Sequence, residues 1–171
     1  MKYFLSLGSN LGDRRKNLER GLDLLTQGGV RILRASSLYR TQPVGYKNQP
    51  WFYNQVVEVS SSLNPYDLLR LIKKIEEGLG REPDGTGGPR PIDIDILLAE
   101  HWIIQTERLV IPHPRMQKRN FVLVPFNEIS PGTSHPLLKK KISELWENSG
   151  DASSVQKLGP LKRAGKNRVS H

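Results

Sequence analysis

The chain has 171 residues and a net charge of +9, with 36% hydrophobic and 25% charged residues, a composition typical of one globular domain. It contains no cysteine, which excludes a disulfide-stabilised fold. No apolar run approaches the roughly 20 residues of a membrane-spanning helix, and the N-terminal apolar stretch is too short for a signal peptide. These features predict a protein of a reducing compartment, most simply the cytoplasm.

Hydrophobic periodicity predicts an alternation of strands and helices. Asp13 is a favourable helix N-cap, and Leu18, Leu22 and Leu25 then recur on one helical face. Asn64, directly before a proline, is a second helix start. In chain order, the pattern predicts a strand at 2–8, a helix between 13 and 28, strands at 30–39 and 53–63, a helix at 64–79, a strand at 92–98, an extension of the sheet at 102–104 and a helix at 140–148.

The order β-α-β-β-α-β predicts a ferredoxin-like fold of the α+β class, an antiparallel sheet with helices on one side, here followed by a C-terminal helix. We expect residues 1–150 to form a single domain without internal repeats. Residues 151–171 are rich in glycine, serine and basic side chains and show no apolar period. They are expected to form a flexible basic tail, for which solvation is a simpler interpretation than nucleic-acid binding.

Two aspartates lie in the strand expected at 92–98. Residues two apart in a strand share a face, so Asp93 and Asp95 should project together while the neighbouring isoleucines face the core. Two like charges side by side repel each other. A Mg²⁺ ion, which proteins hold with one or two carboxylates plus substrate phosphates, would offset this repulsion. A solvated polar face is the alternative, but the glycine-rich loop upstream and Arg90 favour a metal and phosphate site.

A basic cluster follows at 111–121. Its side chains His113, Arg115, Gln117, Lys118 and Arg119 carry positive charge or can donate hydrogen bonds to phosphate. Arginine in particular offers a bidentate fork to phosphate oxygens. Taken alone, the cluster is more simply interpreted as a solvated basic loop.

The segment 41–54 is a loop rich in aromatic residues. Its rings could close over a flat heterocycle, with Thr41 and Asn54 supplying hydrogen bonds, because small-molecule sites combine apolar walls with a few placed polar groups. The alternative is that Trp51 and Phe52 cover the edge of the core.

Four segments resemble, in order and spacing, the motifs of one enzyme family. They are residues 7–12 (LGSNLG), 39–45 (YRTQPVG), 88–95 (GPRPIDID) and 112–123 (PHPRMQKRNFVL). The chain therefore resembles the 6-hydroxymethyl-7,8-dihydropterin pyrophosphokinase family over about residues 1–148, nearly all of it except the tail.

The resemblance implies an enzyme of folate biosynthesis, an Mg²⁺-dependent diphosphotransferase that moves the diphosphate of ATP onto the pterin hydroxymethyl group and releases AMP, with two Mg²⁺ ions. By resemblance, the metal ligands are Asp93 and Asp95; the pterin pocket comprises Thr41, Pro43, Val44, Phe52, Asn54 and Phe121; and the ATP contacts are Lys73, Glu76, Arg81, Arg90, Ile96, Arg108, His113 and Arg119. Arg81, Arg90, Asp93, Asp95 and His113 are the implied catalytic residues. The rings of Phe52 and Phe121 are expected to sandwich the pterin.

The resemblance is incomplete in the loop that closes over the phosphates. The family usually carries further basic residues and a tryptophan just before Gly-Pro-Arg. Here residues 82–87 (EPDGTG) look one residue short, and Thr86 and Gly87 stand where an arginine and the tryptophan are expected. We expect slower turnover than in a family member with the complete loop, with the pterin site unaffected.

An RNA-binding module of the same fold is the main alternative. Such a module presents aromatic residues on the exposed face of its central strands, where this chain has aspartates. A ligand-sensing domain would not need the acid pair together with His113 and Arg119, and no candidate nucleophile supports a phosphohydrolase. The expected partners are therefore two small molecules, ATP and the pterin, with no nucleic acid, no membrane and no second subunit.

Overall fold

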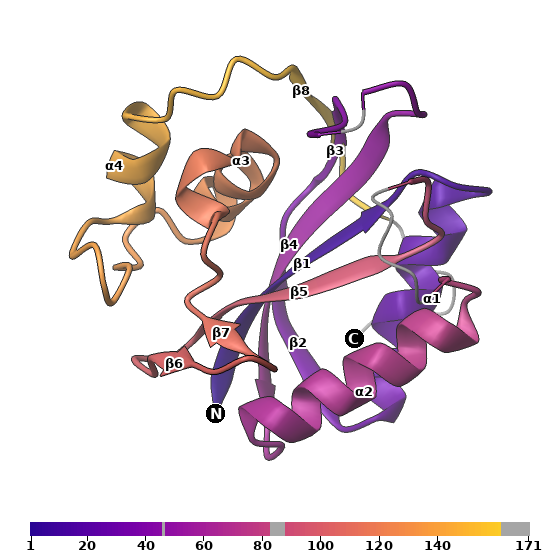
Figure 1. Ribbon diagram of the computed structural model, residues 1–171, viewed down its shortest axis with the longest axis horizontal. Helices are drawn as coiled ribbons and strands as arrows, with labels where there is room; N and C mark the ends of the chain where they lie inside the picture. The colour runs from indigo at the N-terminus through magenta and orange to yellow at the C-terminus, as the bar shows by residue number, and fades with distance from the viewer. Residues whose placement is uncertain (46, 83–87, 162–171) are drawn as a thin grey trace, which may run out of the picture.

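The computed structural model describes residues 1–45, 47–82 and 88–161 and shows a six-stranded antiparallel sheet between two pairs of helices (Figure 1). The elements are, in chain order, β1 (Lys2–Ser9), α1 (Arg14–Gln27), β2 (Val30–Ala35), β3 (Leu38–Thr41), β4 (Phe52–Ser61), α2 (Pro65–Gly78), β5 (Asp93–Ala99), β6 (Ile104–Gln105), β7 (Val110–Ile111), the short 3-10 helix η1 (Met116–Lys118), α3 (Asn120–Ile129), α4 (Ile142–Glu147) and β8 (Val155–Gly159). Both predicted helix starts are confirmed, because Asp13 caps α1 and Asn64 caps α2 through their side chains.

The main sheet has the strand order β5-β1-β4-β3-β8, and β2 also pairs with β4. β1 is thus a central strand, antiparallel to both β4 and β5. With α1 and α2 packed on one face, this arrangement confirms the predicted ferredoxin-like pattern. The opposite face, for which the sequence predicted no cover, carries α3 and α4.

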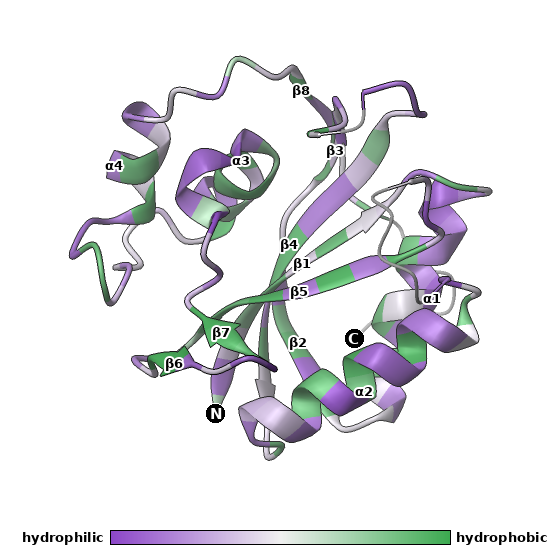
Figure 2. Cartoon of the chain, in the orientation of Figure 1, coloured by the Kyte–Doolittle hydropathy of each residue, from purple (hydrophilic) through white to green (hydrophobic). Residues whose placement is uncertain are grey.

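Two hydrophobic cores lie on opposite faces of the sheet. Strand alternation directs Leu5 and Leu7 of β1 toward α1 and α2, while Phe4 points to the other face. There Phe4 stacks on Phe126 of α3 with 4.4 Å between ring centroids. Figure 2 shows the alternation along β5, where hydrophilic and hydrophobic bands succeed each other.

The prediction of one strand at 30–39 is wrong, because this segment forms two strands. β2 pairs with one half of β4, and β3 pairs with the other half. Between them, the Ser36 N–H donates to the Val56 carbonyl, and the Ser36 hydroxyl accepts from the Val56 N–H at 3.0 Å. A side-chain oxygen thus takes the place of a ladder carbonyl and separates the two strands.

The prediction that 102–104 would extend the main sheet is also wrong. β6 instead pairs with β7 in a separate two-stranded sheet. The helix α3 was not predicted, because its sequence contains Pro125 and no side-chain cap precedes it. Packing in the second core stabilises this helix in place of favourable local signals.

Part of the expected flexible tail is a strand. β8 pairs with β3 at the edge of the main sheet, so the tail prediction is wrong for residues 155–159 and the folded chain continues beyond residue 150. The basic stretch 162–171 lies outside the described residues. So do residues 83–87, on which the expected slower turnover depends.

Candidate active site

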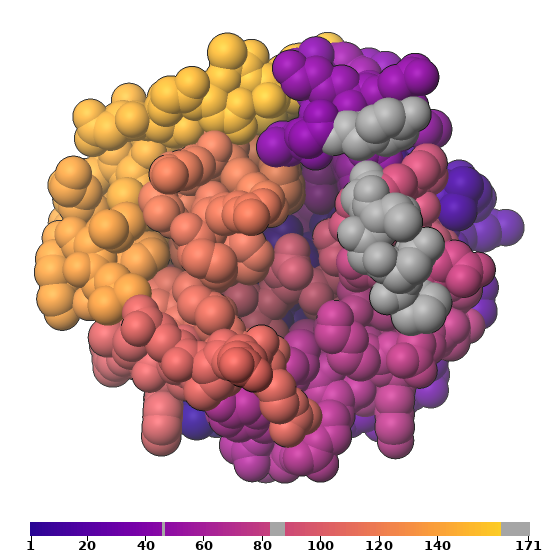
Figure 3. All heavy atoms as spheres, viewed as in Figure 1, coloured from indigo at the N-terminus to yellow at the C-terminus, as the bar shows by residue number. Residues whose placement is uncertain are grey.

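The molecule is hollowed on the face of the sheet that carries α3. Figure 3 shows this hollow between the orange atoms of the segment around α3, the purple atoms of the loop before β4 and the magenta atoms of α2. α3 packs against Leu97 and Leu98 in the later part of β5. The first residue of the same strand, Asp93, lines a cavity at this place.

Asp93 and Asp95 share the face of β5 that is turned away from α1 and α2. The isoleucines that alternate with them, Ile92, Ile94 and Ile96, are at most 5% exposed and belong to the first core. Both aspartates are partly exposed. The predicted alternation is confirmed, and it is the reason that two carboxylates occur side by side on one face.

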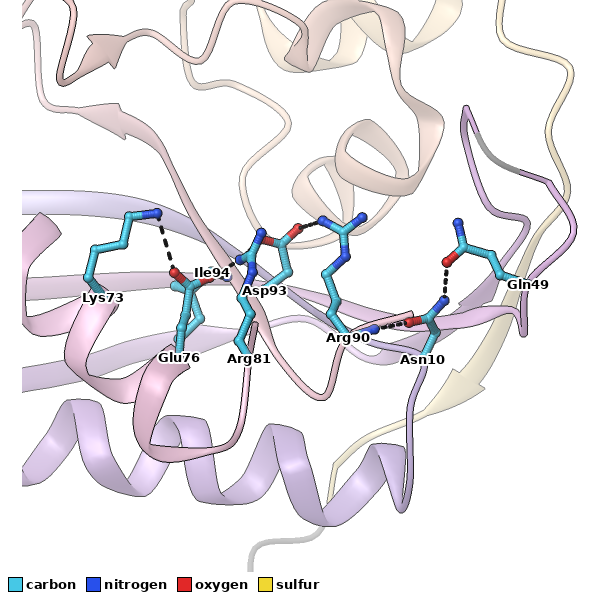
Figure 4. Close-up of polar contacts among 8 residues, drawn as sticks. All are labelled: Asn10, Gln49, Lys73, Glu76, Arg81, Arg90, Asp93 and Ile94. Carbon is cyan, nitrogen blue, oxygen red and sulfur yellow. Dashed lines mark hydrogen bonds and ion pairs between the residues drawn. The ribbon is translucent and has the colours of Figure 1, made fainter. Parts of the chain in front are cut away.

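Asp93 accepts hydrogen bonds from two arginines. Arg81 donates to its Oδ1 at 2.6 Å, and Arg90 donates to its Oδ2 at 3.3 Å (Figure 4). Arg81 also donates to the carboxylate of Glu76 on α2. Lys73, one turn earlier on α2, lies 3.5 Å from the other Glu76 oxygen. Four of the expected ATP contacts therefore form one network around Asp93.

Glu76 anchors this network to the sheet. Its side chain is buried, and its Oε2 accepts a hydrogen bond from the backbone N–H of Ile94 at 3.1 Å. Burial raises the pKa of Glu76, while the neighbouring Arg81 acts in the opposite direction. Because this carboxylate is fixed by β5, it orients Arg81 toward Asp93.

The carboxylate of Asp95 makes no hydrogen bond and no close ion pair with the described residues, and Arg119 and Arg81 act on it only through longer-range attraction. Burial, and next the carboxylates of Asp93 and Glu76, raise the pKa of Asp95 to about 7. A carboxylate without a direct ion pair beside a second carboxylate fits a hard divalent ion such as Mg²⁺. No group of three His, Cys, Asp or Glu side chains suited to a metal occurs among the described residues. The pair would therefore hold such an ion together with oxygens from a substrate.

Most of the expected pterin residues line a cavity of about 250 Å³ that also includes Asp93. Its lining residues are Thr41, Gln42, Val44, Phe52, Asn54, Arg90, Asp93, Arg115, Arg119 and Phe121. The guanidinium of Arg90 lies over the Phe52 ring and that of Arg119 over the Phe121 ring, each 5.6 Å from the centroid. One cavity therefore combines aromatic rings, arginines and a carboxylate. Gln42 and Arg115 were not assigned to it from the sequence.

The polar part of this cavity depends on a glycine in β1. The Asn54 side chain donates to the Thr41 hydroxyl at 2.5 Å, and both side chains are buried. A Cβ atom on Gly8 would lie 2.5 Å from Asn54 Oδ1 and 3.4 Å from the Phe52 ring. Only glycine leaves room for both side chains at this position. Gly8 of the segment 7–12 thus shapes the cavity because it has no side chain. The sequence did not reveal this role.

His113 is a neutral imidazole in this site. Burial, and next the positive charge of Arg119, lower the pKa of His113 to about 4. The Arg115 N–H donates to His113 Nδ1 at 3.2 Å, so the ring proton is assigned to Nε2. The backbone N–H of His113 donates to the Leu97 carbonyl and ties the basic segment to β5. His113 can therefore donate one hydrogen bond to an anionic oxygen.

The lowered pKa of His113 predicts a pH-dependent stability. The unfolded chain protonates this residue below about pH 6.5, whereas the folded chain does so only below about pH 4. As the pH falls between these values His113 destabilises the folded state, by about 2 kcal/mol at pH 5. Urea unfolding should therefore show that His113→Gln loses less stability than the parent between pH 7 and pH 5. The same change at exposed His101 is the control, and equal profiles for all three proteins would contradict the expectation.

Three predicted residues lie apart from both the cavity and the charged groups around Asp93. Ile96 packs in the first core and is 5% exposed. Arg108 lies over the Tyr66 ring and lines a different cavity of about 600 Å³ near the start of α2. Pro43 lines a neighbouring cavity of about 380 Å³. The structure thus brings together most of the predicted residues but not these three.

Asn10 joins the two loops that border the site. Its buried side chain donates to Gln49 Oε1 at 2.9 Å and to the Pro50 carbonyl at 3.0 Å, and it accepts from the Arg90 N–H at 2.8 Å (Figure 4). These bonds connect the loop before β4 to the segment before β5. Asn10 belongs to the motif 7–12, but the sequence gave no sign of these partners, which are distant along the chain.

Residues 4–131 match the model of the family described as 7,8-dihydro-6-hydroxymethylpterin-pyrophosphokinase (HPPK). The chain belongs to this family. It is 48% identical over 127 residues to the 2-amino-4-hydroxy-6-hydroxymethyldihydropteridine pyrophosphokinase of Bacillus subtilis, which covers 74% of this chain and 76% of that protein. It is 40% identical to the protein of the same name from Aquifex aeolicus, over 83% of this chain and 88% of that one. The resemblance carried by the four sequence motifs is confirmed.

Longer proteins contain a similar segment. The folic acid synthesis protein fol1 of Pneumocystis carinii is 41% identical over 148 residues, which is 86% of this HPPK chain but 20% of that protein. An HPPK-DHPS structure from Plasmodium falciparum matches with a TM-score of 0.71 and 20% identity. That match covers 85% of this chain and 45% of the other, and it supports the HPPK fold.

Proposed function

We propose that this chain transfers the diphosphate of ATP to the hydroxymethyl group of 6-hydroxymethyl-7,8-dihydropterin and releases AMP. As a member of the HPPK family, it is a pyrophosphokinase of folate biosynthesis that uses ATP as co-substrate. The observation that carries the assignment of substrates to sites is the single cavity in which two phenylalanines, three arginines and Asp93 meet.

The pterin is assigned to the aromatic part of the cavity. Phe52 and Phe121 offer ring faces to a flat heterocycle, and stacking of this kind contributes about 1–3 kcal/mol per ring. Thr41 and Asn54 offer hydrogen-bonding groups to its polar edge. In this orientation the hydroxymethyl group extends toward Asp93, where the phosphates are expected.

The ATP phosphates are assigned to the cationic side chains. Arg81, Arg90, Arg119 and Lys73 come from separate segments, and their charges can neutralise the oxygens of a triphosphate. Neutral His113 adds one N–H donor. Transfer of a phosphoryl-type group depends mainly on in-line positioning and charge stabilisation. The hydroxymethyl oxygen forms a bond to the β-phosphorus and gives up its proton to water, and the bond from that phosphorus to the oxygen of AMP breaks.

Asp93 and Asp95 are proposed to hold Mg²⁺, with two ions expected. Bound there, the metal would polarise phosphate oxygens and align them with the attacking oxygen. Arg81 and Arg90 now donate hydrogen bonds to the Asp93 carboxylate, and phosphate oxygens would compete with it for both guanidinium groups. The site is therefore arranged so that anionic substrates can exchange partners with side chains already in place.

Incubation with ATP, Mg²⁺ and the pterin tests the proposal directly. We expect AMP and the pterin diphosphate in equal amounts, AMP formation only when the pterin is present, and loss of both products when a chelator is added. ADP in place of AMP would mean transfer of a single phosphoryl group and would exclude the pyrophosphokinase assignment.

We further propose that the chain acts as a monomer in the cytoplasm. Its substrates are small molecules, and the described cavity is formed by one chain. None of the helices in the described ranges has the length and apolar character needed to cross a bilayer. The RNA-binding alternative is not favoured, because the chain belongs to an enzyme family and the open face of the sheet carries aspartates.

A further inference from the structure

We infer that residues 150–154 form a strap that fixes the spacing of the two walls of the pterin cavity, with Asp151 as a positioning residue for pterin binding. The inference rests on the proposed function. The strap lies beyond residues 4–131, the region that matches the family model. It connects α4 to β8, and it contacts the two walls through different residues.

The first wall is the start of α3. Asp151 Oδ2 accepts a hydrogen bond from the Asn120 backbone N–H at 2.8 Å, and the Asp151 carbonyl accepts from the Asn120 side-chain amide at 2.9 Å. Arg119, the residue at the N-cap position, makes no side-chain capping bond. Asp151 therefore caps α3 from a distant part of the sequence, and its negative charge suits a helix N-terminus. Phe121, one of the two aromatic walls, directly follows Asn120.

The second wall is the loop after β3. The Gln42 N–H donates to the Ser154 carbonyl at 3.1 Å, and the Ser154 N–H donates to Gln42 Oε1 at 2.7 Å. Gln42 lines the pterin cavity together with Thr41. The pairing continues into the sheet, where Thr41 lies opposite Val155 of β8. One short segment is thus bonded to both sides of the same cavity.

Hydrogen bonds position the strap more than packing does. The Ser153 N–H donates to Asp151 Oδ1 at 2.9 Å and holds the turn between the two attachments. A cavity of about 380 Å³ lies between the strap and the loop that contains Pro43 and Trp51. If two atoms in van der Waals contact move apart by about 0.5–1 Å, they already lose a quarter to a half of their attraction energy. The separation of the walls should therefore control pterin affinity, and Asp151 should control that separation.

The test compares three variants with the parent. Asp151→Ala removes the cap acceptor and should raise both the Kd for the pterin, titrated without nucleotide, and the KM for the pterin by roughly five- to tenfold. The KM for ATP and the kcat should stay within about twofold of the parent. Asp151→Asn keeps an acceptor oxygen for the Asn120 N–H, so it should restore pterin binding. Asp13→Ala removes the cap of α1 and should lower Tm without changing the pterin constants.

The outcomes separate the strap from the proposed function. Unchanged pterin constants in Asp151→Ala would overturn the strap, and so would a rise matched by Asp13→Ala or an equal rise in the KM for ATP. If the parent makes no AMP, the proposed reaction fails, but the Kd comparison among the four proteins still decides the strap. A parent that neither binds the pterin nor makes AMP from it overturns both.

Discussion

Replacing Asp95 by asparagine should lower kcat by about 10²–10³-fold, the effect expected when one group that stabilises charge in a transition state is removed. The ATP Kd should change much less, because Arg81, Arg90 and Lys73 are also proposed to hold the triphosphate. The amide keeps the shape of the carboxylate but has no charge with which to retain a divalent ion. Steady-state kinetics and titration with ATP and Mg²⁺ would measure both quantities.

The same substitution should increase the stability of the protein without substrates. Burial and the nearby carboxylates of Asp93 and Glu76 outweigh the opposing attraction of Arg119 and Arg81, so the negative charge of Asp95 opposes folding. Asp93→Asn is the matched variant. It should also lose activity, but it should lower Tm because Asp93 accepts from Arg81 and Arg90. A fall in Tm of the same size in both variants would show that Asp95 is paired in solution.

Phe52→Ala should weaken pterin binding by about 10–100-fold, which corresponds to the stacking energy of one ring. The ATP Kd should stay within a few-fold of the parent value, because the ring lies in the part of the cavity that is assigned to the pterin. Phe52→Tyr keeps the ring face and should retain most of the affinity. Pterin and ATP titrations on the two variants would measure these changes independently of turnover.

Arg90 offers a second interpretation of Phe52 that these titrations also decide. The Arg90 guanidinium lies over the Phe52 ring, so the ring could act by supporting the arginine. In that case Phe52→Ala would weaken ATP and pterin binding equally. Selective loss of the pterin would identify the ring itself as part of the pterin site.

Local sequence signals predicted most of the fold. Side-chain caps predicted the starts of α1 and α2, and alternation predicted the orientation of Asp93 and Asp95. The division of 30–39 into two strands was not predictable in this way, because it depends on hydrogen bonds between Ser36 and Val56, twenty residues apart. Likewise β8 has no apolar period of its own and is a strand because β3 offers it an edge.

The candidate site was predictable in its residue types more than in its connections. The motifs indicated carboxylates, arginines and aromatic rings. They did not indicate that Glu76 would be buried and bonded to the Ile94 backbone, or that Asn10 would join two loops. Such contacts join positions far apart in the sequence, and a local pattern contains no information about them. Arg108 shows the converse, since the family resemblance assigns it to ATP but it lies over Tyr66 beside a different cavity.

The central place of β1 has a consequence for synthesis on the ribosome. β1 is made first, yet one of its two neighbours, β5, ends only at Ala99. At typical elongation rates the nascent chain carries an open edge of β1 for on the order of ten seconds, and an open edge can pair with another chain. β5 closes that edge, and the same strand brings Asp93 and Asp95. A nascent chain therefore gains its acid pair in the step that covers β1, and β5 then becomes the edge strand of the sheet.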